Sequence, residues 1–492
     1  MMRRARSLLL LLLGACAAAA QEVPSHPDKL SYAPLRFEVP DAAAMRTSLS
    51  TGTPAYLLED PSLPIVDLQI LVRTGSFADP KGKEGLADLC ASLMRTGGTA
   101  TRAPDALDEE LDFLAANLSV SLGDVSGTAS LSVLAKDLDR GLAILVDVLK
   151  HPAFRPEKLE VLKAQALDGL KARNDSTASI EAREANLLFY GDYPLNRLAT
   201  KASVESITRE DLASFHKTWF HPSRFLVAAA GKFKKEELVA KLEAAFKDWG
   251  PPGDAALKAP PATYAATPGI RCFHKDGKNI NQGRVTMGHL GVDVRHPDVQ
   301  AIRVMSYILG AGGFSSRLMQ KVRTEEGLAY DVRSDLRPGI AYPLPFKIVF
   351  QSKSESVAYA AKLCLEEVAK IQKEGVKEAE LAAAKAFYLD AFPGLFFATK
   401  MQTASTYAQA EMLDLPKDYY RSYREKIAAL TTEEIRRVAR EHLKPERVAW
   451  VVVGNIPAVK KGDGKHAVTL ADLGPLTDVP LADPATLERP TK

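Results

Sequence analysis

The sequence predicts an α+β protein built from two related domains in tandem. Strand-like alternation and helix-like periodicity occur in mixed runs, which favours α+β layers over a strict parallel βαβ array. A pattern in the first half recurs in the second half at a constant offset of 223 residues. Between the halves, residues 249–269 are rich in proline and are typical of a linker. We therefore expect domains at 33–248 and 270–457.

Three pairs of segments define the repeat, and no gap is needed to align them. They are Ile207–Leu212 with Leu430–Ile435, His221–Arg224 with Lys444–Arg447, and Leu226–Gly231 with Ala449–Gly454. One shared Thr-x-Glu helix start would be weak evidence, because it resembles a common capping pattern. The constant offset indicates a domain duplication rather than a short solenoid repeat.

Within the first domain, periodicity and turn residues predict the elements in order. Strands are expected at 53–58, 64–73, 119–121, 128–134 and 224–230. Helices are expected at 85–95, 104–117, 136–150, 155–173, 178–190, 208–220 and 234–248.

The second domain repeats this mixture of elements. Strands are expected at 270–275, 283–290, 329–336, 345–351 and 447–453, and helices at 298–309, at 315–324 and between the last two strands. Residues 458–492 hold Lys, Gly, Asp, Pro and Thr with few large apolar groups, which predicts a flexible tail.

The N-terminus predicts a signal peptide at 1–20. Arg3, Arg4 and Arg6 precede the apolar run Leu8–Leu13, and small residues follow up to Ala20. We expect cleavage after Ala20 and secretion across the inner membrane, to the bacterial periplasm. Leu13-Gly14-Ala15-Cys16 also resembles a lipoprotein signal, so Cys16 lipidation is the alternative and would give the chain its one link to a membrane.

Composition argues against a nucleic-acid partner. The chain has 492 residues, of which 46% are hydrophobic and 25% charged, as in ordinary globular proteins. Without residues 1–20, which hold three arginines and no acid, 61 basic residues face 61 acidic ones. The remaining cysteines, Cys90, Cys272 and Cys364, are odd in number and far apart, so we expect buried thiols rather than disulfides.

Residues 85–99 read Gly-Leu-Ala-Asp-Leu-Cys-Ala-Ser-Leu-Met-Arg-Thr-Gly-Gly-Thr. Leu86, Leu89, Leu93 and Met94 fall at helical spacing, and Gly97-Gly98 ends the helix. With the preceding Val72–Ser76, this stretch resembles the zinc helix of the pitrilysin/insulinase (M16) peptidases. The resemblance extends over both predicted domains. It implies tandem LuxS/MPP-like metallohydrolase domains, each a mainly antiparallel sheet covered by helices.

The M16 family carries His-x-x-Glu-His in this helix, where two His bind zinc and the Glu polarises water. In this sequence the three positions are Asp88, Ala91 and Ser92, which cannot replace two imidazoles and a general base. The family's third ligand is a Glu on a later helix similar to 157–173, whose central positions here are Gln165, Asp168 and Gly169. No two of the nine histidines lie three or four residues apart. We expect no metal or cofactor in this chain and no peptidase activity of the chain alone.

A third stretch, Ser316–Tyr330, is similar to the family pattern in which an Arg and a Tyr seven residues apart reach the substrate. The matching residues are Arg323 and Tyr330, at the end of a helix and the start of a strand. A guanidinium and a phenol aimed at one carbonyl can orient a peptide and stabilise negative charge. The alternatives are an Arg that only complements its helix dipole and a Tyr that only packs. The match of the whole stretch favours substrate binding.

Some two-chain M16 enzymes divide these features between subunits. The resemblance therefore implies a non-catalytic, substrate-binding subunit of a heterodimer. A catalytic M16 partner would supply the zinc, and this chain would complete a chamber for a peptide or unfolded polypeptide. A structural or peptide-binding M16 homologue without a protease partner is the alternative, and a stand-alone hydrolase with unfamiliar ligands is a third hypothesis.

Overall fold

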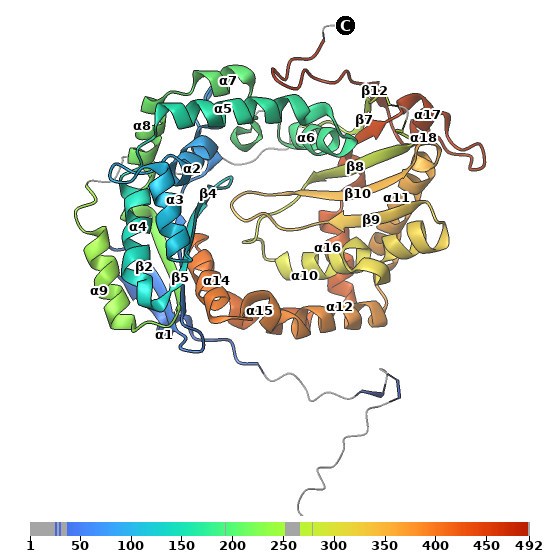
Figure 1. The fold of residues 1–492 in the computed structure, drawn as a ribbon. Helices are drawn as coiled ribbons and strands as arrows, with labels where there is room; N and C mark the ends of the chain where they lie inside the picture. Colours follow the sequence, from blue (N-terminus) through green and yellow to red (C-terminus); the bar gives the residue numbers. More distant parts are fainter. Residues whose placement is uncertain are drawn as a thin grey trace, which may run out of the picture. The chain divides into compact units, whose positions relative to one another are not determined.

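The computed structural model describes residues 25–26, 29–30, 37–191, 193–250, 266–277 and 279–490, and Figure 1 draws its fold. The chain divides into a short unit that ends at Glu38 and one compact unit that begins at Val39. The predicted signal peptide 1–20, with Cys16, and most of the predicted linker 249–269 lie outside the described residues. None of the helices among the described residues combines the length and the hydropathy of a membrane span.

A six-stranded sheet of order β1-β2-β6-β3-β5-β4 forms the centre of the first half. Its strands are β1 (Arg46–Ser48), β2 (Pro54–Glu59), β3 (Ile65–Val72), β4 (Asn117–Leu122), β5 (Gly127–Leu134) and β6 (Phe225–Gly231). Neighbours are antiparallel except β2 and β6, which are parallel. Strand β6 is apolar throughout because it lies inside the sheet and is buried on both faces.

The second half contains a sheet of order β12-β7-β11-β8-β10-β9. Its strands are β7 (Gly269–His274), β8 (Gln282–Leu290), β9 (Ala329–Asp335), β10 (Pro345–Lys353), β11 (Ala449–Gly454) and β12 (Leu476–Asp478). Strand β7 is parallel to β11 and β12, and the other pairs are antiparallel. Strands β2, β3, β4, β5 and β6 therefore have counterparts β7, β8, β9, β10 and β11 at the same places.

Helices cover both sheets. In the first half they are α1 (Ala42–Met45), α2 (Leu86–Thr96), α3 (Pro104–Phe113), α4 (Leu138–Lys150), α5 (Pro156–Lys171), α6 (Thr177–Tyr190), α7 (Lys201–Ser206), α8 (Arg209–Trp219) and α9 (Lys235–Phe246). Those of the second half are α10 (Val299–Ser306), α11 (Val357–Glu374), α12 (Glu378–Asp390), α13 (Phe392–Phe396), α14 (Lys400–Met412), α15 (Tyr419–Ala429), α16 (Thr432–His442), α17 (Ile456–Lys461) and α18 (Leu470–Leu473). Helix α3 ends before the predicted residue 117, because Ala115 has a φ of 48° and Asn117 already begins β4.

The structure confirms the predicted α+β fold with a duplicated architecture. Helices α8 and α16 begin and end 223 residues apart, and each starts with a capping box, from Thr208 and Thr431 respectively. A single 3₁₀ turn then leads into β6 in one half and into β11 in the other. The free cysteines Cys90, Cys272 and Cys364 are buried, as predicted.

Each half contributes one helix that packs on the sheet of the other half. Helix α6 packs on β8 and β11 of the second sheet, and its Ile180 and Phe189 share a core cluster with Val451. Helix α14 packs on β2 and β6 of the first sheet, and Figure 1 shows both arrangements. At the end of α14, Glu411 accepts from Arg46 at 2.8 Å and from the Tyr56 hydroxyl at 2.7 Å. The sequence pattern predicted these helices but not which sheet each would cover.

The prediction of a flexible tail at 458–492 is wrong over its described part. Val459 of α17 and Leu470 of α18 are buried, and β12 pairs with β7. The chain then returns to the first half, where Asn174 donates to the carbonyl of Ala482 at 2.9 Å. Few apolar residues suffice here because short backbone pairings and caps order the segment.

Candidate functional site

Helix α2 turns one face into the core and the other to solvent. Leu86, Leu89, Leu93 and Met94 are buried, as their spacing predicted. Asp88 and Ser92 are exposed and Ala91 is buried. These positions present a carboxylate, a hydroxyl and a methyl group, which do not fit a zinc site built from imidazole, thiolate or several carboxylates.

Acidic groups gather at the start of α2. Asp79, which the sequence analysis did not single out, accepts from the backbone N–H groups of Gly85 at 2.9 Å and Ala87 at 2.8 Å. Burial raises the pKa of Asp79 to about 7. The pKa of Asp88 is also raised, first by loss of hydration and then by Asp124. Asp79 precedes α2, where a carboxylate complements the helix dipole. Its position before the helix was the signal in the sequence for this role.

Helix α5 lies against α2, as expected of the helix that would carry the third ligand. Gln165, Asp168 and Gly169 are exposed, and Asp168 pairs with Lys171 at 2.7 Å. A Cβ added at Gly169 would meet no atom within 4 Å, so space for a larger side chain exists there. The two helices are thus kept together without the side chains of the family's metal site.

Arg323 and Tyr330 lie side by side, at the positions that the pattern predicted. Arg323 belongs to the π-helical turn η9 (Met319–Glu325), and Tyr330 is the second residue of β9. The Arg323 Cζ atom lies 4.5 Å from the centroid of the Tyr330 ring and 4.5 Å from that of Phe314. The guanidinium is therefore held between two aromatic faces, a contact worth about 0.5–1 kcal/mol each at an exposed site.

The polar ends of this sandwich face outward. Tyr330 is 82% exposed and Phe314 is 63% exposed. Among the described residues, no hydrogen bond or ion pair reaches the Arg323 guanidinium or the Tyr330 hydroxyl, so both can bind a ligand. Phe314 was missed from the sequence; its position after Gly312-Gly313, where Gly313 has a φ of 62°, was the available signal.

Two π-helical turns support the sandwich. Besides η9, residues Tyr307–Ala311 form η7, in place of the predicted α-helical ends. In η7, a Cβ added at Gly310 would come within 2.3 Å of the Ser334 backbone nitrogen, so only glycine lets η7 pack this closely on β9. Turns of this type are often found at functional sites.

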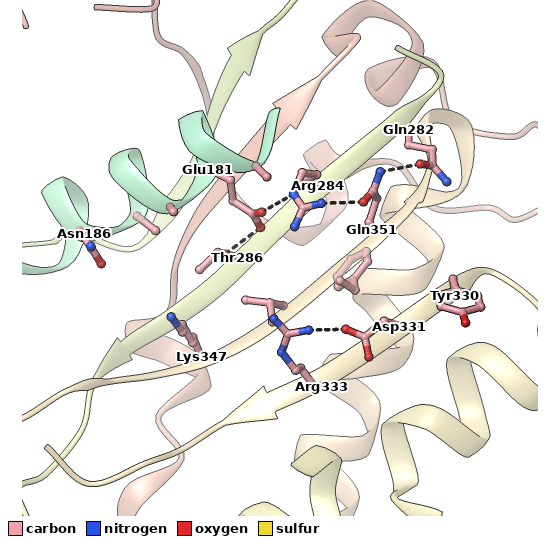
Figure 2. Close-up of a pocket in the computed structure, with 15 residues that line it drawn as sticks. Glu181, Asn186, Gln282, Arg284, Thr286, Tyr330, Asp331, Arg333, Lys347 and Gln351 are labelled. Carbon is pink, nitrogen blue, oxygen red and sulfur yellow. Dashed lines mark hydrogen bonds and ion pairs between the residues drawn. The ribbon is translucent and has the colours of Figure 1, made fainter. Parts of the chain in front are cut away.

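A cavity of about 550 Å³ lies between α6 and the polar face of the second sheet, and Tyr330 is one of its lining residues (Figure 2). Polar side chains from three adjacent strands point into it. They are Gln282, Arg284 and Thr286 of β8, Asp331 and Arg333 of β9, and Lys347 and Gln351 of β10. The alternation of polar and apolar residues along these strands was the signal for this face, whereas its cover by α6 had no local signal.

Glu181 of α6 ties the helix to this face. It is 5% exposed, accepts from Arg284 Nε at 2.6 Å, and accepts from the Thr286 hydroxyl at 2.9 Å. Arg284 also donates to Gln351 Oε1 at 2.6 Å, and Gln351 donates to Gln282 at 2.5 Å, as Figure 2 shows. This chain of bonds makes one wall of the cavity rigid.

The remaining cations of the cavity are balanced by acids. Arg333 pairs with Asp331, and Lys347 lies 3.8 Å from Asp335. A lining with both donors and acceptors and little net charge suits the amide groups of a peptide. Strand β9 is also the last strand of its sheet, so one of its edges is paired with no described strand and can accept an extended segment.

Comparisons with known proteins agree with this architecture. Residues 55–197 match the family described as insulinase (peptidase family M16), and residues 206–388 match the peptidase M16 inactive domain. The chain is 25% identical over 410 residues to the non-peptidase homolog YmxG of Helicobacter pylori, covering 82% of this chain and 92% of that protein. It is also 25% identical over 436 residues to an uncharacterized zinc protease of Mycobacterium tuberculosis, covering 86% of this chain and 96% of that protein.

A solved structure with the same fold is a peptidase M16 inactive domain from Pseudomonas fluorescens. It superposes with a TM-score of 0.74 at 24% identity and covers 83% of this chain and 97% of that chain. The likeness concerns the fold.

Proposed function

Because the chain belongs to the peptidase M16 family, we propose that it is a non-catalytic, substrate-binding subunit of a heteromeric M16 zinc metallopeptidase. One observation supports this above all. Helix α2 lacks zinc-binding side chains at Asp88, Ala91 and Ser92, while Arg323 and Tyr330 are kept and stacked, with Tyr330 exposed and Arg323 half-buried. A subunit that only positions substrate needs the second feature and not the first.

In this proposal, the peptide lies along the open edge of β9 beside the cavity. Arg323 and Tyr330 donate hydrogen bonds to a carbonyl oxygen of the peptide, where negative charge develops during cleavage. Phe314 and Tyr330 contact the Arg323 guanidinium and restrict its motion, which orders its planar set of N–H donors for a ligand.

The partner is a catalytic M16 chain with an intact His-x-x-Glu-His helix, and the zinc belongs to that partner. The pair encloses a peptide or unfolded polypeptide. We place the complex in the bacterial periplasm because of the N-terminal signal pattern, with attachment to a membrane if Cys16 is lipidated.

Co-purification from the native cell and a cleavage assay test the proposal. The chain should co-purify with an M16 chain that has the intact motif, and only the mixture of the two chains should cleave an unfolded protein substrate. Zinc-dependent cleavage by the partner at the same rate with and without this chain would refute it.

The alternative function is a structural or peptide-binding M16 homologue without a protease partner. The relative described as a non-peptidase homolog favours it. Under this alternative, the purified chain binds unfolded peptide in the cavity that Tyr330 helps to line, and no M16 chain co-purifies with it.

A further inference from the structure

A cluster of two imidazoles and one carboxylate lies in the second half, away from α2. His296 and Asp298 come from the turn before α10, and His442 is the last residue of α16. Their ligand atoms all lie within 4.8 Å of one another. The two histidines are 146 residues apart in the chain, so sequence spacing gave no indication of this cluster.

Each pair of these three residues is in contact. His442 Nε2 lies 2.8 Å from Asp298 Oδ2. The His296 and His442 rings are 4.9 Å apart and nearly perpendicular, at 89°. The backbone N–H of Asp298 donates to His296 Nδ1 at 3.1 Å, which fixes the orientation of the His296 ring, and a metal ion bound at Nδ1 has to displace this N–H.

Arg437 also pairs with Asp298, and its positive charge opposes a cation at this site. Its Nη2 atom donates to Asp298 Oδ1 at 2.6 Å, while Nη1 is 3.2 Å from Oδ2 and 2.6 Å from Glu441. The short bond therefore occupies the oxygen that His442 does not use. Ligating carboxylates are commonly held by such an outer hydrogen bond. Asp298 and Glu441 together outweigh the single charge of Arg437.

We propose that His296, Asp298 and His442 form a binding site for a divalent transition metal, with Zn²⁺ as the ion tested first. Two imidazoles and one carboxylate suit Zn²⁺, Ni²⁺ and Cu²⁺, and they disfavour Ca²⁺ and Mg²⁺, which need more oxygen ligands. The ion takes the place of the His442–Asp298 hydrogen bond and links the start of α10 to the end of α16. This site is separate from helix α2, where the zinc ligands of the family are missing. The proposal revises the prediction that this chain binds no metal.

Calorimetry on the untagged, chelator-treated full chain tests the site. We expect one equivalent of Zn²⁺, tighter binding of Cu²⁺, no heat with Ca²⁺, and a higher unfolding temperature with Zn²⁺. His442→Ala and His296→Ala should each weaken Zn²⁺ binding by at least about 10-fold. Co²⁺ in place of Zn²⁺ should give visible absorption bands in the wild type that His442→Ala removes.

His274→Ala is the matched control, because His274 also bonds a carboxylate, Asp276 at 2.7 Å, but belongs to no group of three metal-binding side chains among the described residues. It should bind Zn²⁺ as the wild type does. Circular dichroism must show that each variant folds, and His442→Gln replaces His442→Ala if that variant does not. A wild type that binds no Zn²⁺, or binding that survives in both His442 variants, overturns the proposal.

Discussion

Glu181→Ala should reveal how strongly α6 is held on the second sheet. Glu181 is almost completely buried and makes two bonds there, to Arg284 at 2.6 Å and to Thr286 at 2.9 Å. Removing one member of a buried ion pair typically costs about 3–5 kcal/mol, because the other charge remains unpaired. The Arg284 side chain is 29% exposed, so water recovers part of that cost. We expect the free energy of unfolding to fall by about 2–3 kcal/mol.

Urea unfolding followed by tryptophan fluorescence measures this change, because Trp450 lies in β11, on which α6 packs. Adding Arg284→Ala should cost less than the sum of the two single changes, since the pair is coupled. Glu160→Ala is the control: Glu160 is 72% exposed and 3.5 Å from Lys163, and its loss should change stability by less than about 0.5 kcal/mol. A Glu181→Ala variant as stable as this control would refute the reasoning.

Three further predictions concern the sites and the C-terminal segment. Tyr330→Phe and Arg323→Ala should each lower the kcat of the reconstituted complex by about 10²–10³ without preventing assembly, and normal turnover would assign both residues to packing. The raised pKa of Asp79 means that the folded chain binds more protons than the unfolded chain between the ordinary carboxyl pKa and about 7, so stability should fall as pH rises through this range. Asp79→Asn should flatten that slope in urea unfolding, and an unchanged slope would contradict the assignment. Arg489→Ala should lower the free energy of unfolding by about 1–2 kcal/mol in the same assay, because Glu184, 2% exposed, then keeps only Arg183 as a cationic partner. An unchanged free energy of unfolding would mean that the C-terminal segment does not stabilise the fold through this ion pair.

Local patterns predicted the elements whose causes are local. The capping boxes at Thr208 and Thr431 fixed the starts of α8 and α16, and the apolar runs that follow fixed β6 and β11. The adjacency of Arg323 and Tyr330 followed from a helix that ends where a strand begins. In each case the controlling interaction lies within a few residues of the pattern.

Long-range features had no such pattern. Nothing near Glu181 indicates that its partner is Arg284, 103 residues later, or that α6 would cover the polar face of the other sheet. The π-helical turns η7 and η9 depart from the 3.6-residue period on which helix prediction rests. Strand β12 is only three residues long and is ordered by its pairing with β7 rather than by its own composition.

The exchange of α6 and α14 also limits how a substrate chamber could close. Pulling α6 off the second sheet would expose Ile180 and Phe189, at roughly 1.5–3 kcal/mol for each side chain, and would break the Glu181 bonds. Lifting α14 would release Glu411 from Arg46 and Tyr56 as well. Both costs are incurred together, because each half holds a helix of the other. The halves of this chain should therefore move as one body, so closure over a peptide must come from motion between this chain and its proposed partner. Amide hydrogen exchange should then find α6 and α14 protected to the same degree in the free chain and in the complex, and early exchange confined to either helix would indicate a chain that opens by itself.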